Sequence, residues 1–382
     1  MKGGKILLKA IDLFCGAGGL SCGLQNAGFE VALGIDIDAN ALASYKNYFQ
    51  DTVTITADIN DISAPIISSL TDLTPGSNFL LAGCPPCQGF SSLGKRDPHD
   101  EKNQLVYQYV RLIQELKPTF ILMENVPGMS KNVGKEIFQK VINLLSKNYI
   151  VEYDTLNAAD FGVPQTRKRL VLHGIRKDVY TLLKQELNND FSLLPEQTHC
   201  DPKKNTNKQY ENWRTVGETI MELPPLVAGE AYNGNDIHNH VCRNLSQTNI
   251  ERLNFAHNTN GYRTSLPEEY RLPCHNGVTT FSDTYGVMHL DKPAPTLTSG
   301  CTTISKGRFG HPTQNRGISL REAAKLQTFP DNFEFIGTLS SISLQIGNAV
   351  PPLLAQASAE KIYHYMTLID NIMNKNINTT AS

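Results

Sequence analysis

Two cysteines separated by two prolines form the clearest candidate for covalent chemistry in the sequence. Residues 83–91 read GCPPCQGFS, and the prolines restrict the backbone immediately before Cys87. A thiol held on such a loop can act as a nucleophile once it has lost its proton. The spacing of Cys84 and Cys87 also fits a redox pair, two metal ligands or a structural loop, although a redox pair normally opens a helix.

A carboxylate follows the next apolar run, which ends in Glu124-Asn125-Val126-Pro127. If the two apolar runs are neighbouring strands, Glu124 and Cys87 lie at the same edge of a sheet. They then make a usable pair of acid and nucleophile. Capping of a following helix is the alternative role for Glu124.

Glycines and two acidic residues at strand ends indicate a nucleoside site. The run Cys15-Gly16-Ala17-Gly18-Gly19 follows the first predicted strand, and Asp36 comes about 20 residues later, where a carboxylate can accept both hydroxyls of a ribose. Asp58 follows the third predicted strand, in a position to meet an adenine edge. The pattern GxGG lacks the full GxGxxG motif, which favours a nucleoside cofactor without a phosphate. The glycines alone would also fit a structural turn.

The elements that position these groups alternate in type up to about Ile175. Strands are predicted at residues 6–13, 31–35, 52–56, 79–82, 120–123, 151–156 and 170–175. Helices are predicted at residues 20–27, 39–48, 104–116 and 135–146. Repeated strand–helix units predict a doubly wound α/β sheet, whose active site lies at the carboxyl ends of the strands.

The composition and periodicity of the sequence change beyond about Arg176. Asn, Thr, His and Pro become dense and regular periodicity fades, which predicts a smaller, loop-rich domain at residues 179–315. Helical order returns at Ser319, an N-cap with Glu322 as its capping-box partner. A last helix from about Pro352 to Ile372 is expected to pack on the first domain. Residues 1–178 therefore form the first domain, and residues 316–382 a segment that completes it.

The composition is that of an ordinary globular protein, with 40% hydrophobic and 19% charged residues among 382. A net charge of −2 gives no overall positive field, so contacts with nucleic acid would come from local clusters such as Lys203-Lys204. On its own, such a cluster is more typical of a solvated surface. Scattered cysteines and the lack of an apolar leader predict a reduced, cytoplasmic protein, and no apolar run reaches the roughly 18 residues of a membrane span.

Taken together, the ordered motifs resemble those of DNA (cytosine-5)-methyltransferases of the bacterial restriction-modification type. The resemblance covers residues 5–175 and 285–352. The matching blocks are residues 12–21, Asp36, Asp58, residues 86–88, Asn103 with Leu105, and residues 124–126, 165–169, 292–298 and 345–351. It implies a Rossmann-like sheet that binds S-adenosyl-L-methionine (AdoMet), a target-recognition domain, and methylation of C5 of a cytosine flipped out of a specific duplex DNA sequence.

The resemblance also implies catalytic roles. Cys87 would add to C6 of the cytosine, and Glu124 would hold N3 and the exocyclic amine. Arg167 is expected to promote the thiolate, and Arg167 or Arg169 to hold the O2 side. Further contacts with the substrate are expected from Gln88, Ser91, Asn125 and Gln165. Residues 88–100 would form the loop that closes over the flipped base.

The cofactor site follows by position. The expected contacts are Phe14, Gly16, Ala17, Asp36, Ile37, Asp58, Ile59, Pro86, Leu105, Asn348 and Ala349. Many relatives carry an aromatic residue where this chain has Ile37. Aliphatic packing would therefore replace stacking on the adenine.

In this family the variable middle, here about residues 180–285, reads the target sequence. Candidates for base or phosphate contacts are Arg243, Arg252, Arg263 and Arg271. A zinc site built from His238, His240 and Cys242, with His199-Cys200 or Cys274-His275, matches no defined zinc module, so no metal is expected. The expected partners are double-stranded DNA and a cognate restriction endonuclease that acts separately. The enzyme is expected to be a monomer that associates with the nucleoid through DNA.

Three other functions fit parts of the sequence. The first is the same chemistry on transfer RNA, which the long variable region disfavours. The second is a catalytically inactive DNA-binding relative, although every expected catalytic position is filled. The third is a redox protein that uses Cys84 and Cys87, which predicts equal importance of the two thiols.

Overall fold

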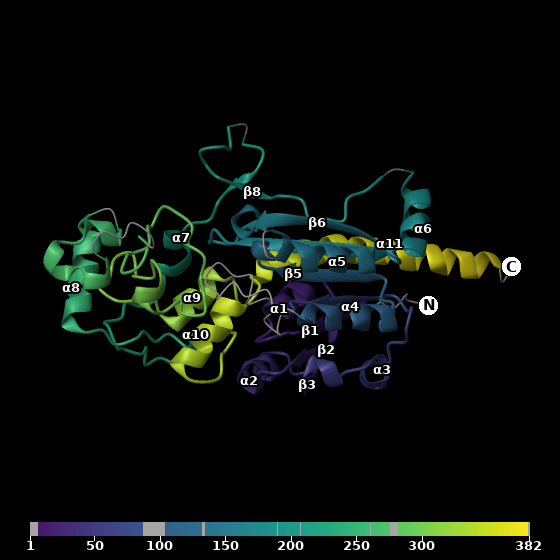
Figure 1. Cartoon of the computed structure of the whole chain (residues 1–382), viewed down its shortest axis with the longest axis horizontal. Helices are drawn as coiled ribbons and strands as arrows, with labels where there is room; N and C mark the ends of the chain where they lie inside the picture. The colour runs from purple at the N-terminus through teal and green to yellow at the C-terminus, as the bar shows by residue number, and fades with distance from the viewer. Residues whose placement is uncertain are drawn as a thin grey trace.

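The computed structural model describes residues 7–86, 104–131, 134–188, 190–206, 208–259, 261–275 and 282–380. The molecule is elongated, with a helix-flanked sheet in one half and short helices joined by loops in the other (Figure 1). Within the described part of the chain, no helix is both long and apolar enough to cross a membrane.

A seven-stranded sheet forms the centre of the first half. Its order is β3 (Val53–Thr56), β2 (Glu30–Asp36), β1 (Lys9–Leu13), β4 (Phe79–Gly83), β5 (Phe120–Asn125), β7 (Lys168–Arg176) and β6 (Tyr149–Asn157). Strands β3 to β5 in this order are parallel, and β7 runs antiparallel to β5 and β6. The sequence predicts a strand at each place, and the doubly wound α/β class is confirmed.

Helices cover both faces of the sheet, because alternate side chains of each strand point to opposite sides. Ile11 and Leu13 of β1 face a core shared with α3 (Ala64–Thr71), α4 (Leu105–Leu116) and α5 (Lys135–Leu145). Ala10 faces a core shared with α1 (Gly19–Asn26), α6 (Lys177–Leu187) and α11 (Pro352–Thr380). The last helix thus returns to the sheet, as the sequence predicts. Helices α3 and α6 are not predicted.

The second half contains α7 (Val216–Ile220), α8 (Gln247–His257), α9 (Leu320–Leu326) and α10 (Leu339–Asn348). One core cluster joins Val216, Phe309, Leu320 and Ile346 to Tyr45 of α2 (Ala39–Tyr48). This core spans the expected boundary at residue 315 and also takes in Cys15, Cys22 and Leu42 of the first half, so the place of α9 and α10 in the first domain stays a prediction. The expected boundary at residue 178 falls inside α6, whose Val179 and Leu183 pack against the sheet.

The predicted capping box at α9 is confirmed, and a buried ion pair reinforces it. Ser319 Oγ accepts the Glu322 N–H, and the Glu322 carboxylate accepts the Ser319 N–H. The Arg316 guanidinium donates to both oxygens of Glu322, at 2.8 and 2.7 Å, and both side chains are only 1% exposed. The pair fixes the start of α9 in the second core.

Glu322→Gln tests this ion pair. The amide can still cap the helix, but Arg316 is left buried without a countercharge, which costs about 3–5 kcal/mol. We therefore expect a clearly lower midpoint of thermal unfolding, measured by circular dichroism. The matched control Glu136→Gln removes the carboxylate of the exposed pair with Lys140 and should leave the midpoint unchanged. Equal midpoints for the two variants would contradict the role given to the buried pair.

Candidate active site

The loop between β1 and α1 has a backbone that only glycine allows at one position. Gly18 has φ +99°, and a Cβ there would lie 2.3 Å from the ring of Phe49. Phe14 and Gly16 also have positive φ, which turns the chain sharply after β1. The predicted glycine loop is therefore a fixed turn at the carboxyl end of a central strand, where ligands of doubly wound sheets bind.

Asp36 holds this loop against the end of β2. Its Oδ2 accepts the Gly16 N–H at 2.7 Å, and its Oδ1 accepts the Asp38 N–H at 2.8 Å. Burial raises the pKa of this carboxyl above its ordinary value, although these hydrogen bonds oppose the shift. Each oxygen keeps a free lone pair, so the ionised carboxylate can still accept a pair of hydroxyls.

The other expected cofactor contacts differ in how they are placed. Ile37 is 68% exposed, so its side chain is open to a ligand. Asp58 accepts the N–H of Asn60 and caps a short helical turn. The Ile59 side chain lies in the core of the sheet, and that of Leu105 packs against the same core. For Ile59, only the backbone can face a ligand.

A distant segment of the chain, residues 348–350, lies directly on the glycine loop. A Cβ on Gly19 would lie 2.3 Å from the Val350 carbonyl oxygen and 3.1 Å from the Ala349 Cβ. Asn348, the last residue of α10, is exposed, and Ala349 is half-buried. The structure therefore brings this expected part of the cofactor site beside residues 16–19.

A buried carboxylate pairs with an arginine at the carboxyl end of β5. Glu124 is 8% exposed, and the Nε of Arg169 lies 2.8 Å from its Oε1. Burial raises the pKa of Glu124 above its usual range, and the charges of Arg169 and Arg167 oppose this only in part. Glu124 therefore binds a proton more readily than an exposed glutamate does.

The loop that leads to Cys87 is anchored to β5. Asn125 Nδ2 donates to the Pro85 carbonyl at 2.9 Å, so its amide positions this loop. Burial raises the pKa of the Cys84 thiol well above its usual value, and the nearby Glu124 adds to the shift. A thiol kept protonated is a poor metal ligand and a poor redox group. Cys87, Gln88 and Ser91 lie outside the described residues.

The arginine block divides into two roles. Arg167 is 1% exposed; its Nη1 donates to the Leu297 carbonyl at 2.6 Å, and its Nη2 donates to the Gly347 and Ala349 carbonyls at 3.0 and 3.1 Å. The buried Gln165 similarly accepts the Leu297 N–H and donates to Gln327. These contacts of Gln165 and Arg167 join the two halves of the molecule, and their expected contacts with the substrate stay predictions. Of the two arginines, Arg169 forms the ion pair with Glu124.

Sequence reasoning missed a buried network beneath the glycine loop. Ser21 Oγ donates to Asp12 Oδ2 at 2.6 Å and lies 2.8 Å from the Tyr45 hydroxyl. Burial raises the pKa of Asp12 to about 7. The network joins β1, α1 and α2 below residues 14–18. An acidic residue inside an apolar strand was the available signal.

The arginines predicted to read the target are held by the protein itself. Arg243 contacts Thr302 and Ser340, the guanidinium of Arg252 donates to Tyr270 and Asn249, and that of Arg271 donates to the Leu266 carbonyl. Arg252 and Arg263 are buried, whereas Arg243 is half-buried and Arg271 is exposed.

The residues weighed as zinc ligands have protein partners. Both ring nitrogens of His240 form hydrogen bonds, one with Ser319 and one with the Pro224 carbonyl. The Cys242 thiol donates to the Val227 carbonyl. In the part of the chain that the structure describes, no three His, Cys, Asp or Glu residues come together as a metal site.

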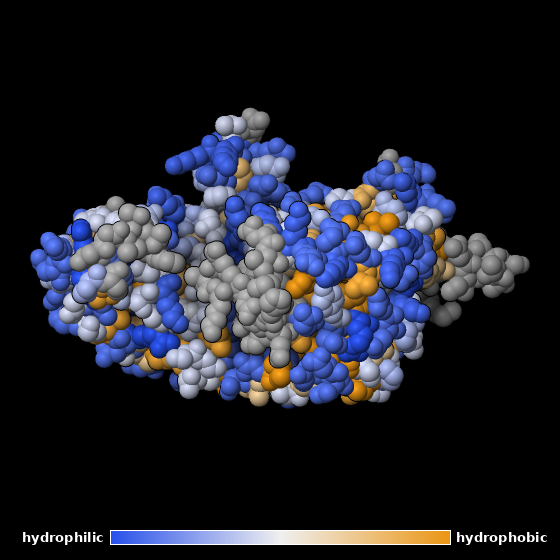
Figure 2. All heavy atoms as spheres, in the orientation of Figure 1, coloured by the Kyte–Doolittle hydropathy of each residue, from blue (hydrophilic) through white to orange (hydrophobic). Residues whose placement is uncertain are grey.

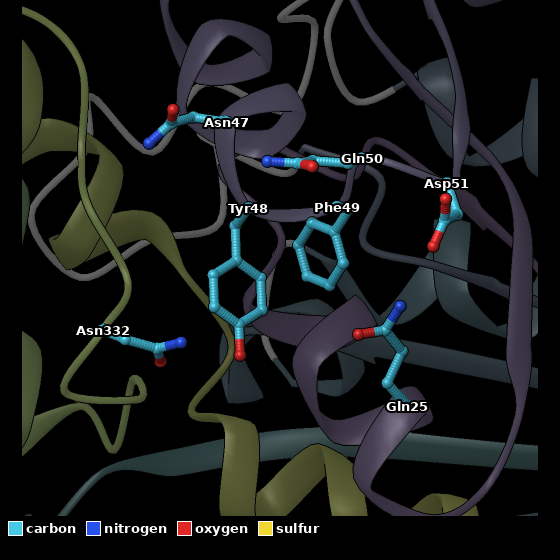
Figure 3. A pocket seen from close by; sticks show the side chains of 7 residues that line it. All are labelled: Gln25, Asn47, Tyr48, Phe49, Gln50, Asp51 and Asn332. Carbon is cyan, nitrogen blue, oxygen red and sulfur yellow. The ribbon is translucent and has the colours of Figure 1, made fainter.

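A polar hollow of about 490 Å³ lies at the other end of α2 from the Asp36–Asp38 turn. Figure 3 shows Tyr48 and Phe49 at its centre, between Gln25, Asp51 and Asn332. A ten-residue helix is about 15 Å long. The hollow therefore lies away from Asp36, although the Phe49 ring that lines it also packs against Gly18 of the glycine loop.

Arg167→Met and Arg169→Met should separate the two roles. Loss of the Arg167 guanidinium leaves buried carbonyls without donors, each at a cost of about 1–3 kcal/mol. We expect a large fall in the thermal midpoint for Arg167→Met and a smaller one for Arg169→Met, because Glu124, whose pKa burial raises, can take up a proton once its partner is lost. The reverse order in a calorimetric scan would show that the assignment of the two arginines is wrong.

Comparison with known proteins identifies a family to which the sequence is similar. The model of the family described as C-5 cytosine-specific DNA methylase matches residues 8–364 of this chain. The Type II methylase M.HgiDII of Herpetosiphon aurantiacus is 36% identical, over 93% of this chain and 95% of that protein. The Type II methyltransferase M1.HphI of Haemophilus parahaemolyticus is also 36% identical, over 93% and 86%.

A solved structure agrees. A putative DNA modification methyltransferase encoded within a prophage of E. coli superposes with a TM-score of 0.66 and 26% identity, over 94% of this chain and 99% of that one. The family match at residues 8–364 includes the sheet, the glycine loop and the strand that carries Glu124. The chain belongs to the C-5 cytosine-specific DNA methylase family.

Proposed function

We propose that this chain transfers a methyl group from AdoMet to C5 of a cytosine flipped out of a specific duplex DNA sequence. The observation that carries the proposal is the buried Glu124–Arg169 pair at the carboxyl end of β5. Strand β4, which leads to Cys84 and Cys87, is the neighbour of β5 in the sheet. A buried acid therefore lies one strand away from the segment that carries the nucleophile.

The residues around the glycine loop fit AdoMet. When bound, AdoMet supplies an electrophilic methyl group. Asp36 has lone pairs free for the ribose hydroxyls, and the exposed Ile37 beside it can pack on an adenine. The proposed contacts also include Phe14, Gly16, Ala17, Asp58, Ile59, Pro86, Leu105, Asn348 and Ala349.

Cys87 is the proposed nucleophile, because cytosine C5 is too electron-poor to attack a methyl sulfonium directly. The thiolate forms a bond to C6, and the displaced electron pair reaches N3, which takes the proton of Glu124. C5 is now enamine-like, and its electron pair forms the bond to the methyl group while the S–CH3 bond breaks and the cofactor leaves as a neutral thioether. A base or a water then removes the C5 proton, the C6–S bond breaks, and N3 returns its proton to Glu124.

Arg169 is the proposed partner of the O2 side of the base, because it is the arginine of the block that reaches Glu124. Its charge also limits how far burial raises the pKa of Glu124. The carboxyl can therefore give up its proton when negative charge develops on N3. Asn125, Gln165 and Arg167 hold the surrounding segments in place.

DNA is favoured over transfer RNA, and activity over a merely binding role. The relatives named above are Type II enzymes, and the buried acid and its arginine are both present. We accordingly propose that the chain is the modification enzyme of a restriction-modification system. It would act as a monomer beside a separate restriction endonuclease.

Covalent trapping tests the nucleophile. A duplex that carries 5-fluorocytosine at the methylated position blocks removal of the group at C5, so wild-type enzyme and AdoMet should give an adduct that survives denaturing electrophoresis. Cys87→Ser should give none, whereas the control Cys84→Ala should still give one, because the Cys84 thiol stays protonated. An adduct that persists in Cys87→Ser, or equal losses in both variants, would contradict the mechanism.

Glu124→Gln tests the acid. The amide cannot donate a proton to N3, so adduct formation should slow by about 10²–10⁴-fold. The raised pKa of Glu124 keeps its proton to a higher pH than an exposed glutamate would, and the rate of the wild type should decline once that proton is lost. A pH–rate profile should lack this alkaline decline in Glu124→Gln. Unchanged rates in the variant would rule out proton donation.

A further inference from the structure

A basic loop, residues 198–214, projects from the molecule beside the sheet. It contains the short strands β8 (His199–Cys200) and β9 (Glu211–Asn212), and Figure 1 shows it standing above β6. Its surface is strongly hydrophilic in Figure 2. Lys203, Lys204, Lys208 and Arg214 are exposed on it.

These four cations are not neutralised by the protein. Within the described ranges, none of their side chains forms an ion pair or a hydrogen bond. The loop also contains two acidic residues, Asp201 and Glu211. Four cations against two carboxylates leave a surplus of two positive charges on a chain whose net charge is −2.

The loop is also firmly built. The Trp213 indole donates to Asp160 at 2.8 Å, and Asn205 Nδ2 donates to the Tyr210 carbonyl at 2.6 Å. The His199 ring packs on Gly162, where a Cβ would lie 2.9 Å from the ring. Because these contacts order the backbone in advance, binding through the lysines costs little further backbone entropy.

The base of the basic loop lies at the β6 edge of the sheet. The same sheet carries the pair of Glu124 and Arg169. Asp160, which holds Trp213, lies just beyond the end of β6, and Asn157 of β6 pairs with Lys168 of β7. Strand β7 continues from there past Val171, the partner of Glu124. Lys168 is exposed and, like Lys204, lies close enough to lower the pKa of Asp160, which burial raises.

We propose that the basic loop binds the phosphate backbone of duplex DNA outside the recognised sequence. The inference rests on the proposed function, because a duplex whose cytosine reaches Glu124 must approach this edge. Exposed lysines suit phosphates as point charges, and such contacts position a duplex without reading its sequence. The described residues of the loop expose no large apolar side chain, which disfavours a membrane.

The test removes the charge without touching the anchors. Lys203→Gln, Lys204→Gln and Lys208→Gln are combined in one variant. The matched control carries Lys46→Gln, Lys147→Gln and Lys177→Gln, all exposed. Lys46 is on α2, whereas Lys147 and Lys177 flank the start of β6 and the end of β7, at the other ends of these strands from the loop. Both should retain the wild-type thermal midpoint. Affinity for a long duplex that contains the methylated sequence is then measured across salt concentrations.

Each phosphate contact adds about 0.9 to the slope of log affinity against log salt. For the loop variant we expect the magnitude of this slope to fall by about two to three. Its affinity near 0.1 M salt should fall at least tenfold. The control should match the wild type, and a duplex trimmed to the recognised sequence should bind all three alike. A loop variant that matches the control, or one that loses affinity only for RNA or anionic vesicles, would overturn the inference.

The proposed function is judged separately. If the wild type methylates no DNA, the proposed function fails whatever the slopes are. If it methylates DNA and the slopes are unchanged, only the role of the basic loop fails.

Discussion

The guanidinium of Arg167 is the interaction on which the arrangement of the whole site depends. Its donors join the start of β7 to carbonyls at residues 297, 347 and 349, which lie 130 to 182 positions further along the chain. The same connection places Ala349 and Val350 on the glycine loop. Because the guanidinium is buried, the loss of any one partner would leave a polar group without water or protein to satisfy it.

This connection leaves Arg169 free for chemistry. Two basic residues separated by one position end up with different tasks, since Arg167 precedes the strand and is enclosed by the second half, whereas Arg169 lies within β7 beside Glu124. Burial and the arginine act on Glu124 in opposite directions, so its pKa is raised but not to the value of an isolated buried acid. The segment that carries Cys87 is fixed to the same strand through Asn125 and Pro85.

Much of the fold follows from local sequence rules. Short apolar runs predict the seven strands of the sheet, and Asp36 and Glu124 are found because they stand where such runs end. The capping box at Ser319 and Glu322 is equally local. Long-range packing is not: neither the enclosure of Arg167 and Gln165 nor the placement of α9 and α10 in the second core is encoded in the spacing of nearby residues. The burial of Arg252 and Arg263 could not be predicted for the same reason, because a surface arginine and a buried one look alike in sequence.

Nucleoside analysis of DNA from a host that expresses the chain tests the central claim most directly. Genomic DNA is digested and examined by liquid chromatography and mass spectrometry, beside DNA from a host that expresses Cys87→Ser. The account predicts 5-methylcytosine in the wild-type sample only, confined by bisulfite sequencing to one short sequence. Methylation confined to RNA, to an exocyclic amine of cytosine or adenine, or present equally in both samples would contradict it.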